Sequence, residues 1–319
     1  MKIKSIALAI ICALAIISTC GCGGNPSVAD NSSEPKATVA PSSHETTEDG
    51  GEVFVKASEN FTKFDTRISF GAETDTIIKL ADGATEIDGA GASCEGDIIT
   101  ISQGGVYVFE GKLSNGGIVV NIEKIEKAQL VFKGVDITNK SGACIYVMSA
   151  DKVAITLAEG TENTLTDAAN YSGLNEKGEP NACIFSKDDL SINGFGSLTV
   201  NGNYNNGIAS KNDLKIVSGI INVKAVNNAL KGKESFSMNS GILTVNSDDD
   251  AIKVNDELSP EKGYIIIEGG ELNITAVDDA LTAFRSVSIT GGKVTTFVGG
   301  KAVNCDGTQN IAEGCLIEK

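Results

Sequence analysis

A short repeat recurs through the C-terminal half of the chain, and it constrains the fold more than any other feature of the sequence. Each copy places a small residue between mostly polar residues and an aliphatic residue, at intervals of 24, 22, 22, 29 and 22. The small residues are Cys183, Gly207, Ala229, Ala251, Ala280 and Ala302. A second position repeats in the same way. It is a glycine that precedes an alternating apolar run, and its copies are Gly196, Gly219, Gly241, Gly270 and Gly292. Both positions share one long step, which predicts a loop at residues 255–262, where Pro260 lies.

Each repeat contains three short apolar stretches, for example Ala251–Val254, Tyr264–Ile267 and Leu272–Ile274. None is long enough for a helix, and turn-forming residues separate them. A coil in which each strand pairs in parallel with its equivalent in the next repeat accounts for this spacing. A β-propeller needs about 40 to 50 residues per blade, and the helix or Asn pattern of a leucine-rich repeat is missing. The sequence therefore predicts an all-β parallel β-helix, a single solenoid with three strands per rung of about 22 residues.

The repeat extends upstream, because Ala143–Tyr146 matches Ala182–Phe185 after a step of 39 residues. The long step predicts a polar loop at about residues 161–180. Cys144 and Cys183 then lie on adjacent rungs, about 4.8 Å apart by strand spacing. Two buried thiols and a disulfide are both compatible with this placement.

The N-terminal region predicts export and lipid anchoring. Residues 1–21 read as a signal peptide with a basic start and an apolar run that is too short to favour a spanning helix. Cys22 follows Gly21, as in bacterial lipoproteins, and is the predicted lipidation site; Cys20 is the alternative, and an ordinary signal peptide with incidental cysteines is the third reading. Residues 22–58, rich in Ser, Thr, Glu and Pro, predict a flexible tether, and residues 59–319 the β-helix. The expected location is the cell surface, anchored on the outer face of the membrane.

The composition excludes several classes of function. The single histidine, His44, lies in the predicted tether, so neither a Ser-His-Asp triad nor a histidine-rich zinc site can be built. The net charge of −16 argues against nucleic-acid binding. Because the chain has no Trp, cellulose binding by a flat tryptophan platform is also excluded.

Acidic residues at the repeat junctions predict a metal site. Equivalent side chains on successive rungs lie about 5 Å apart, so clustered carboxylates repel one another unless a cation binds. An exported protein with oxygen ligands favours calcium. The candidate ligands are Asp248, Asp249, Asp250, Asp278, Asp279, Asn227 and Asn228. The alternative is that these Asp and Asn residues only form turns.

Three segments, residues 151–167, 184–194 and 198–204, resemble a known family. It is the family of bacterial carbohydrate-binding domain-containing proteins with a pectate-lyase-like right-handed β-helix, and the resemblance covers about residues 60–319. It implies a right-handed parallel β-helix, bound Ca²⁺, and binding of cellulose and acidic polysaccharides such as polygalacturonate, with no established catalytic activity. The family's acidic pair is replaced by Asn205-Asn206 and Asn227-Asn228, which puts calcium in doubt at those rungs.

The predicted function is polysaccharide binding without catalysis, by a cell-surface lipoprotein that contains calcium. Calcium can join Asp to a sugar carboxylate, which offsets the repulsion between an acidic protein and an acidic glycan. Lys211, Lys231, Lys253 and Arg285 are the candidate glycan-binding residues. A calcium-dependent polysaccharide lyase, in which Arg285 would be the base, is one alternative. A protein-binding adhesin is the other.

Overall fold

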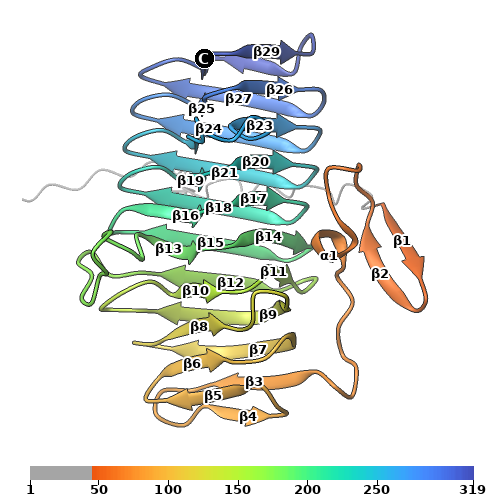
Figure 1. Ribbon diagram of the computed structural model, residues 1–319, viewed down its shortest axis with the longest axis vertical. Helices are drawn as coiled ribbons and strands as arrows, with labels where there is room; N and C mark the ends of the chain where they lie inside the picture. The colour runs from red at the N-terminus through yellow and green to blue at the C-terminus, as the bar shows by residue number, and fades with distance from the viewer. Residues whose placement is uncertain (1–44) are drawn as a thin grey trace, which may run out of the picture. The chain divides into compact units, whose positions relative to one another are not determined.

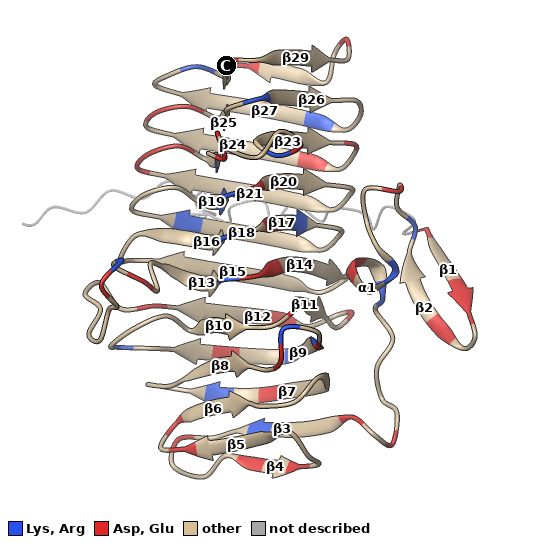
Figure 2. Ribbon diagram, in the orientation of Figure 1, with Lys and Arg blue, Asp and Glu red and all other residues tan. Residues whose placement is uncertain are grey.

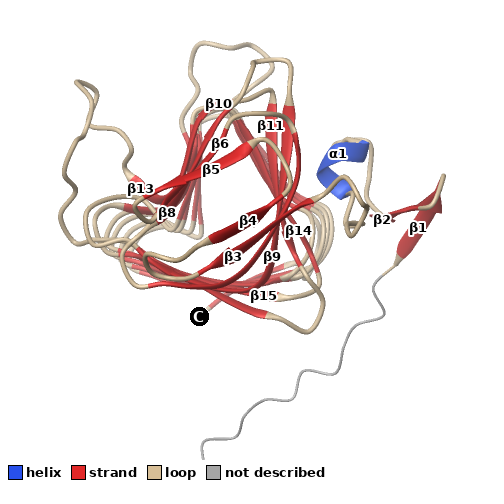
Figure 3. Ribbon diagram, turned by 90° about the horizontal axis from the view of Figure 1, so that it is seen from below, coloured by secondary structure: helices blue, strands red, loops and turns tan. Residues whose placement is uncertain are grey.

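The computed structural model describes residues 45–319, in which short parallel strands coil around a common axis (Figure 1). Seen along the axis, the strands form three faces around one core (Figure 3). All strand pairings are parallel except β1–β2, β3–β4 and β5–β6. The predicted all-β parallel β-helix is confirmed.

The first face is a ten-stranded sheet. Its strands are β5 (Ala92–Glu95), β6 (Ile98–Ile101), β8 (Gly117–Asn121), β10 (Ile145–Ser149), β13 (Ala182–Ser186), β16 (Asn206–Ser210), β19 (Leu230–Gly232), β22 (Ile252–Val254), β25 (Leu281–Ala283) and β28 (Val303–Cys305).

The second face begins with β3 (Thr76–Leu80), beside which β4 (Glu86–Asp88) runs antiparallel. It continues through β7 (Gly105–Leu113), β9 (Lys127–Thr138), β11 (Lys152–Leu157), β14 (Asp189–Gly194), β17 (Asp213–Ile216), β20 (Ser235–Met238), β23 (Tyr264–Ile267), β26 (Ser286–Ile289) and β29 (Thr308–Ile311).

The long strand β9 bends from the second face onto the third, because it pairs with β11 at one end and with β12 at the other. The third face comprises β12 (Glu162–Thr166), β15 (Ser197–Gly202), β18 (Ile220–Ala225), β21 (Ile242–Ser247), β24 (Glu271–Ala276), β27 (Lys293–Val298) and β30 (Leu316–Glu318).

Stacked aliphatic side chains fill the coil. One ladder on the first face joins register partners from β10 to β25, and every member is fully buried. Its members are Ile145, Ile184, Ile208, Leu230, Ile252 and Leu281. Burying one such side chain stabilises the fold by about 1.5 to 3 kcal/mol, so the ladders hold successive rungs in register.

Rung boundaries agree with the repeat analysis, apart from one loop. Strands β22, β23 and β24 coincide with the three predicted stretches, and the loop at residues 255–262 separates β22 from β23. The loop predicted at residues 161–180 begins later, because Glu162–Thr166 forms β12 with Asn163 and Leu165 buried. The connecting loop therefore spans residues 167–181.

Cys144 and Cys183 lie on adjacent rungs, as predicted. The Cys144 amide donates to the Cys183 carbonyl at 2.9 Å, and both side chains are buried. Both are free thiols, which decides between the two alternatives that the sequence leaves open.

The N-terminal part of the described chain corrects the predicted tether. Within residues 22–58, β1 (Thr46–Asp49) and β2 (Glu52–Val55) form an antiparallel hairpin, with Phe54 and Val55 buried. The hairpin is followed by α1 (Lys63–Thr66), where Thr62 and Asp65 form a capping box. The β-branched and aromatic run Val53-Phe54-Val55 is a strand signal that the surrounding polar composition hides.

Asp65 fastens this segment to the second face. Its carboxylate is fully buried and lies 2.8 Å from Lys152 Nζ on β11 and 3.3 Å from Lys215 Nζ on β17. The Asn193 amide on β14 donates to the carbonyls of Asp65 and Arg67 at 2.7 and 3.0 Å. Burial opposes ionisation, but the two ammonium groups outweigh it and hold the pKa of Asp65 below its ordinary value. We call this arrangement the Asp65 clasp.

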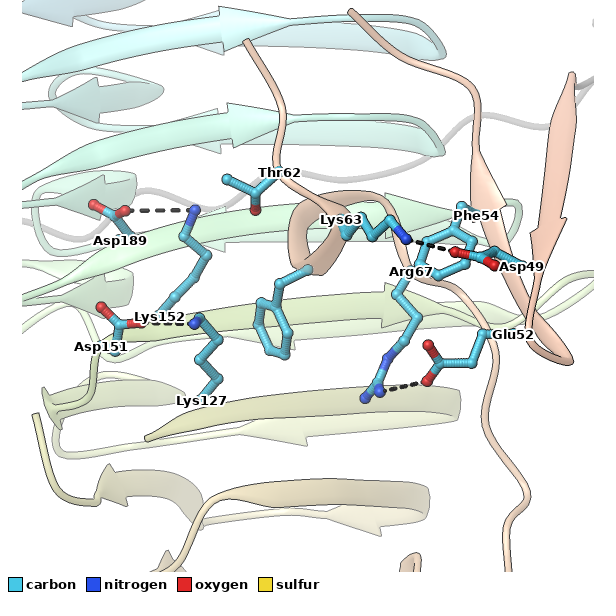
Figure 4. A pocket seen from close by; sticks show the side chains of 11 residues that line it. Asp49, Glu52, Phe54, Thr62, Lys63, Arg67, Lys127, Asp151, Lys152 and Asp189 are labelled. Carbon is cyan, nitrogen blue, oxygen red and sulfur yellow. Dashed lines mark hydrogen bonds and ion pairs between the residues drawn. The ribbon is translucent and has the colours of Figure 1, made fainter. Parts of the chain in front are cut away.

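A pocket of about 640 Å³ lies beside the Asp65 clasp (Figure 4). Its charged walls are matched in pairs: Lys63 with Asp49, Arg67 with Glu52, Lys127 with Asp151 and Lys152 with Asp189. The walls come from both the N-terminal segment and the β-helix, and their charges compensate one another. We therefore interpret this pocket as part of the contact between the two.

The predicted signal peptide, Cys20, Cys22, His44 and the tether before residue 45 lie outside the described residues. Between residues 45 and 319, no helix has the length and apolar character needed to cross a membrane.

Candidate functional site

Three carboxylates from two successive rungs converge at one corner of the β-helix. Asp249 and Asp250 lie in the turn before β22, and Asp278 lies in the turn before β25. One carboxylate oxygen from each lies within 4.8 Å of the others. Figure 2 shows acidic loops at this corner on consecutive rungs. We call Asp249, Asp250 and Asp278 the acid cluster.

The acid cluster carries uncompensated negative charge. Asp250 is buried, and its Oδ2 lies 2.7 Å from Lys253 Nζ, the one ammonium that pairs with the cluster among the described residues. Repulsion from Asp279, together with slight desolvation and the charges of Asp250 and Asp249, raises the pKa of the exposed Asp278. A cation bound among these oxygens relieves that repulsion.

Two further observations indicate that the corner fits a cation. Asn228, on the rung before Asp250, is 3% exposed, and its Oδ1 has no hydrogen-bond donor among the described residues. A Cβ added to Gly300 would lie 2.3 Å from Asp279 Oδ1 and 2.8 Å from Asp278 Oδ1, so this glycine leaves room for the carboxylates. Carboxylate and amide oxygens form the ligand set of a hard divalent cation such as calcium.

The remaining predicted ligands have other roles. Asp279 accepts hydrogen bonds from the Lys301 amide at 2.7 Å and from Asn304 Nδ2 at 2.6 Å. Asn227 Oδ1 accepts from the Asn228 amide at 2.8 Å, and Asp248 is exposed outside the acid cluster. Of the seven predicted residues, the structure therefore brings together Asp249, Asp250 and Asp278, with Asn228 on the neighbouring rung.

The candidate glycan-binding lysines Lys211, Lys231 and Lys253 lie in two rows. Lys231 and Lys253 are register partners on β19 and β22, but the partner of Lys231 on β16 is Ala209. Lys211 follows Ser210, which pairs with Gly232, so it aligns with Lys233 instead. The spacing of 20 residues from Lys211 to Lys231 falls two short of the repeat, which is the physical reason for the difference.

Arg285 is engaged elsewhere. Its Nε donates to the Ser259 carbonyl at 3.0 Å and its Nη2 to the Glu257 carbonyl at 3.4 Å. It therefore binds the loop at residues 255–262, at the end of β25 opposite the turn that holds Asp278.

The first face also carries a groove that was not among the sequence predictions. Lys187, Lys211 and Lys233 follow β13, β16 and β19, and each amide donates to a carbonyl on the preceding rung. Together with Lys231 they line two adjoining hollows of about 710 and 200 Å³. We call these four residues and the hollows between them the lysine groove. The sequence does contain a pattern that predicts this row of lysines. The spacings from Lys187 to Lys211 and from Lys211 to Lys233 are 24 and 22, which are those of the repeat.

Comparisons with known proteins identify the family. A family model described as "Carbohydrate-binding domain-containing protein" matches residues 95–315. The chain belongs to this family. A curated relative with the same description, from Acetivibrio thermocellus, is 56% identical over 219 residues, which cover 68% of this chain and 77% of the relative.

A solved structure shares the fold of this carbohydrate-binding domain-containing protein. It is described as the polysaccharide lyase-like protein from C. thermocellum, in a gadolinium derivative. It superposes with a TM-score of 0.76 at 45% identity and covers 77% of this chain and 100% of its own. The acid cluster and the lysine groove both fall within the part of the chain that matches the family, whereas the Asp65 side of the clasp precedes it.

Proposed function

We propose that this protein binds polysaccharide without cleaving it, and that a calcium ion held by the acid cluster takes part. The observation that carries the proposal is the convergence of Asp249, Asp250 and Asp278, with the orphaned Asn228 oxygen on the preceding rung, in a member of a carbohydrate-binding family. Calcium at this corner would present a positive charge to a carboxylated sugar. Polygalacturonate and cellulose are the proposed glycans.

Calcium is favoured over softer metals by the ligand set, which contains oxygen and neither thiolate nor imidazole. The neighbouring solved structure is described as a gadolinium derivative, and gadolinium, like calcium, is a hard cation that prefers oxygen. When bound, calcium would supply positive charge, while the protein fixes the ligands on two stacked rungs.

Absence of catalysis is proposed because both arginines are already engaged. Arg285 binds two backbone carbonyls, and Arg67 pairs with Glu52 and donates to Gln129. A lyase remains the second candidate for one reason. Burial and the nearby charges of Lys253 and Lys211 lower the pKa of Lys231, which is the direction that a general base requires.

Export and lipid anchoring at Cys22 complete the proposed function. They rest on the sequence of residues 1–22, and they would place the glycan-binding domain at the outer face of the membrane. Incorporation of labelled palmitate into the wild-type chain, and its loss in Cys22→Ser but not in Cys20→Ser, tests this part.

Retention on insoluble cellulose and on immobilised polygalacturonate, in calcium and in EDTA, tests the binding function. Absorbance near 232 nm, followed in parallel with soluble polygalacturonate, detects the unsaturated product of a lyase. We expect calcium-dependent retention and constant absorbance. Rising absorbance would make the protein a lyase, and absence of retention on both glycans would overturn carbohydrate binding and favour the adhesin.

A further inference from the structure

The lysine groove lies between the first face and the loop at residues 167–181. The smaller hollow is floored by Phe185 and Ala209, and the larger is walled by loop residues Asn175–Glu179. Lys211 and Lys233 line both hollows, so the two hollows adjoin.

Positive charge in the groove exceeds its compensation. Among residues 45–319, Lys187, Lys231 and Lys233 form no ion pair with a carboxylate. Lys231 is half-buried as well, and burial together with Lys253 and Lys211 lowers its pKa, although the charges of Asp249 and Asp250 act in the opposite direction. The net charge of the chain is −16, so three unpaired lysines in one groove form a positively charged patch on an acidic protein.

Lys211, the fourth lysine of the groove, forms an ion pair with Glu179. Glu179 reaches in from the loop, is 6% exposed, and places Oε1 2.5 Å from Lys211 Nζ. Asn175 Nδ2 also donates to this carboxylate, at 3.3 Å. The groove thus already holds one carboxylate that is ion-paired with a groove lysine and supplied by the protein itself; Glu176 also lines the larger hollow.

Aromatic rings adjoin the lysines. Tyr146 and Phe185 are register partners on β10 and β13, with ring centroids 5.8 Å apart. Lys187 Nζ lies 5.6 Å from the Tyr146 centroid, and Lys211 Nζ lies 5.9 Å from that of Phe185. Phe185 is buried and Tyr146 is partly exposed, so Tyr146 provides apolar contact for a sugar face while the lysines provide charge for its acid group.

We propose that the lysine groove is a metal-independent binding site for a linear carboxylated glycan, in which Glu179 occupies the position of one ligand carboxylate. The bound glycan displaces Glu179 from Lys211 and pairs with Lys187, Lys231 and Lys233. This inference rests on the proposed polysaccharide binding and assigns it a second site, separate from the acid cluster. The strong negative net charge favours a glycan over a nucleic acid, which needs a broad basic face.

Affinity electrophoresis of the full-length chain, purified in detergent, through gels containing polygalacturonate and EDTA tests the proposal. Lys231→Gln and Lys187→Gln should each weaken binding, by about tenfold for loss of one charge-assisted contact. Neither change leaves a carboxylate unpaired. Lys224→Gln, at an exposed position of β18 on the third face, is the matched control and should leave binding unchanged.

Glu179→Gln should change the affinity for the glycan in the opposite direction. Removal of the internal carboxylate should strengthen binding by about threefold, whereas Glu86→Gln, at an exposed position of β4, should have no effect. Gels with dextran sulfate or hydroxyethylcellulose in place of polygalacturonate distinguish a carboxylated ligand from a sulfated or a neutral one.

Each outcome decides the matter. Equal binding by wild type, Lys231→Gln and Lys187→Gln overturns the site. Failure of the wild type to bind in EDTA, with binding restored by calcium, overturns the metal-independent site and leaves the proposed function intact. Failure to bind any glycan with or without calcium overturns both. Stronger retardation by dextran sulfate than by polygalacturonate overturns the carboxylated ligand.

Discussion

Lys231 and Lys253 are register partners on β19 and β22, yet only Lys253 has a carboxylate, Asp250, at 2.7 Å. Burial opposes the charge of both ammonium groups. For Lys253 the partner outweighs burial and raises the pKa, whereas burial, with Lys253 and Lys211 nearby, lowers the pKa of Lys231. One strand spacing therefore separates a lysine that supports the acid cluster from a lysine that is free for a ligand.

Substitution of Asp278 tests the calcium site. Because Asp279, Asp250 and Asp249 raise the pKa of Asp278, Asp278→Asn should slightly raise the melting temperature in EDTA. It should also remove most of the calcium-induced stabilisation, which for the wild type is about 2.7 kcal/mol at a calcium concentration 100 times Kd. Scanning calorimetry in EDTA and in calcium measures both effects. Asp248→Asn is the control, and an equal calcium shift in all three proteins would contradict the site.

Loss of Asp65 should destabilise the protein strongly. Asp65→Ala leaves Lys215 buried without a carboxylate partner and leaves Lys152 with Asp189 alone, at 3.5 Å. Breaking such a buried pair costs about 3 to 5 kcal/mol. Urea denaturation gives the free energy of unfolding. Lys63→Ala, which removes an exposed ion pair with Asp49, should have a much smaller effect, because solvent screens exposed ion pairs. Similar small losses in both variants would show that the N-terminal segment is not fastened to the β-helix.

Asp167 makes stability depend on pH. Burial raises its pKa to about 6, although Tyr171 Oη and the Asn203 amide donate to it. A carboxyl whose pKa is higher in the folded than in the unfolded state binds more protons when folded. Its contribution to stability is complete below about pH 4, near the unfolded pKa, and is lost as the pH rises through about 6.

The difference between wild type and Asp167→Asn isolates this contribution. Melting temperatures from pH 3.5 to 7.5 should show the wild type losing stability, relative to the variant, between about pH 4 and 6. Parallel curves across this range would show that Asp167 titrates normally.

The cysteines should react in two groups. Cys144 and Cys183 are buried, and burial raises the pKa of Cys183, so both should resist alkylation in the native protein. Cys94, Cys305 and Cys315 are partly exposed and should react. Iodoacetamide labelling followed by peptide mass spectrometry measures each site, with urea-unfolded protein as the control. Native labelling of Cys144 or Cys183 at the rate of Cys305 would contradict the packing.

Much of the fold can be predicted from the sequence because each rung of a solenoid repeats the same residue pattern. The small residue at Ala251 and Ala280 recurs wherever the chain turns into the first face, and the interval between copies fixes the rung. The hairpin and the Asp65 clasp have no such repetition. Lys152 and Lys215 contact Asp65 across 87 and 150 residues of sequence, which no local pattern reveals.

The candidate site was predictable only in part for a related reason. Register places Asp250 and Asp278 on successive rungs, and the structure brings them together. The sequence does not show which way a side chain turns, so it does not distinguish Asp278 from Asp279, whose oxygens accept from Lys301 and Asn304. The lysine groove depends on a loop that folds back over the strands, and that loop has no repeat.

Retention of the wild type and of the double variant Asp249→Asn/Asp278→Asn on polygalacturonate tests the central claim most directly. In calcium, we expect the wild type to be retained strongly and the double variant at the lower level that the wild type shows in EDTA. Equal retention of both proteins in calcium, with no effect of EDTA on either, would contradict calcium-assisted glycan binding at the acid cluster.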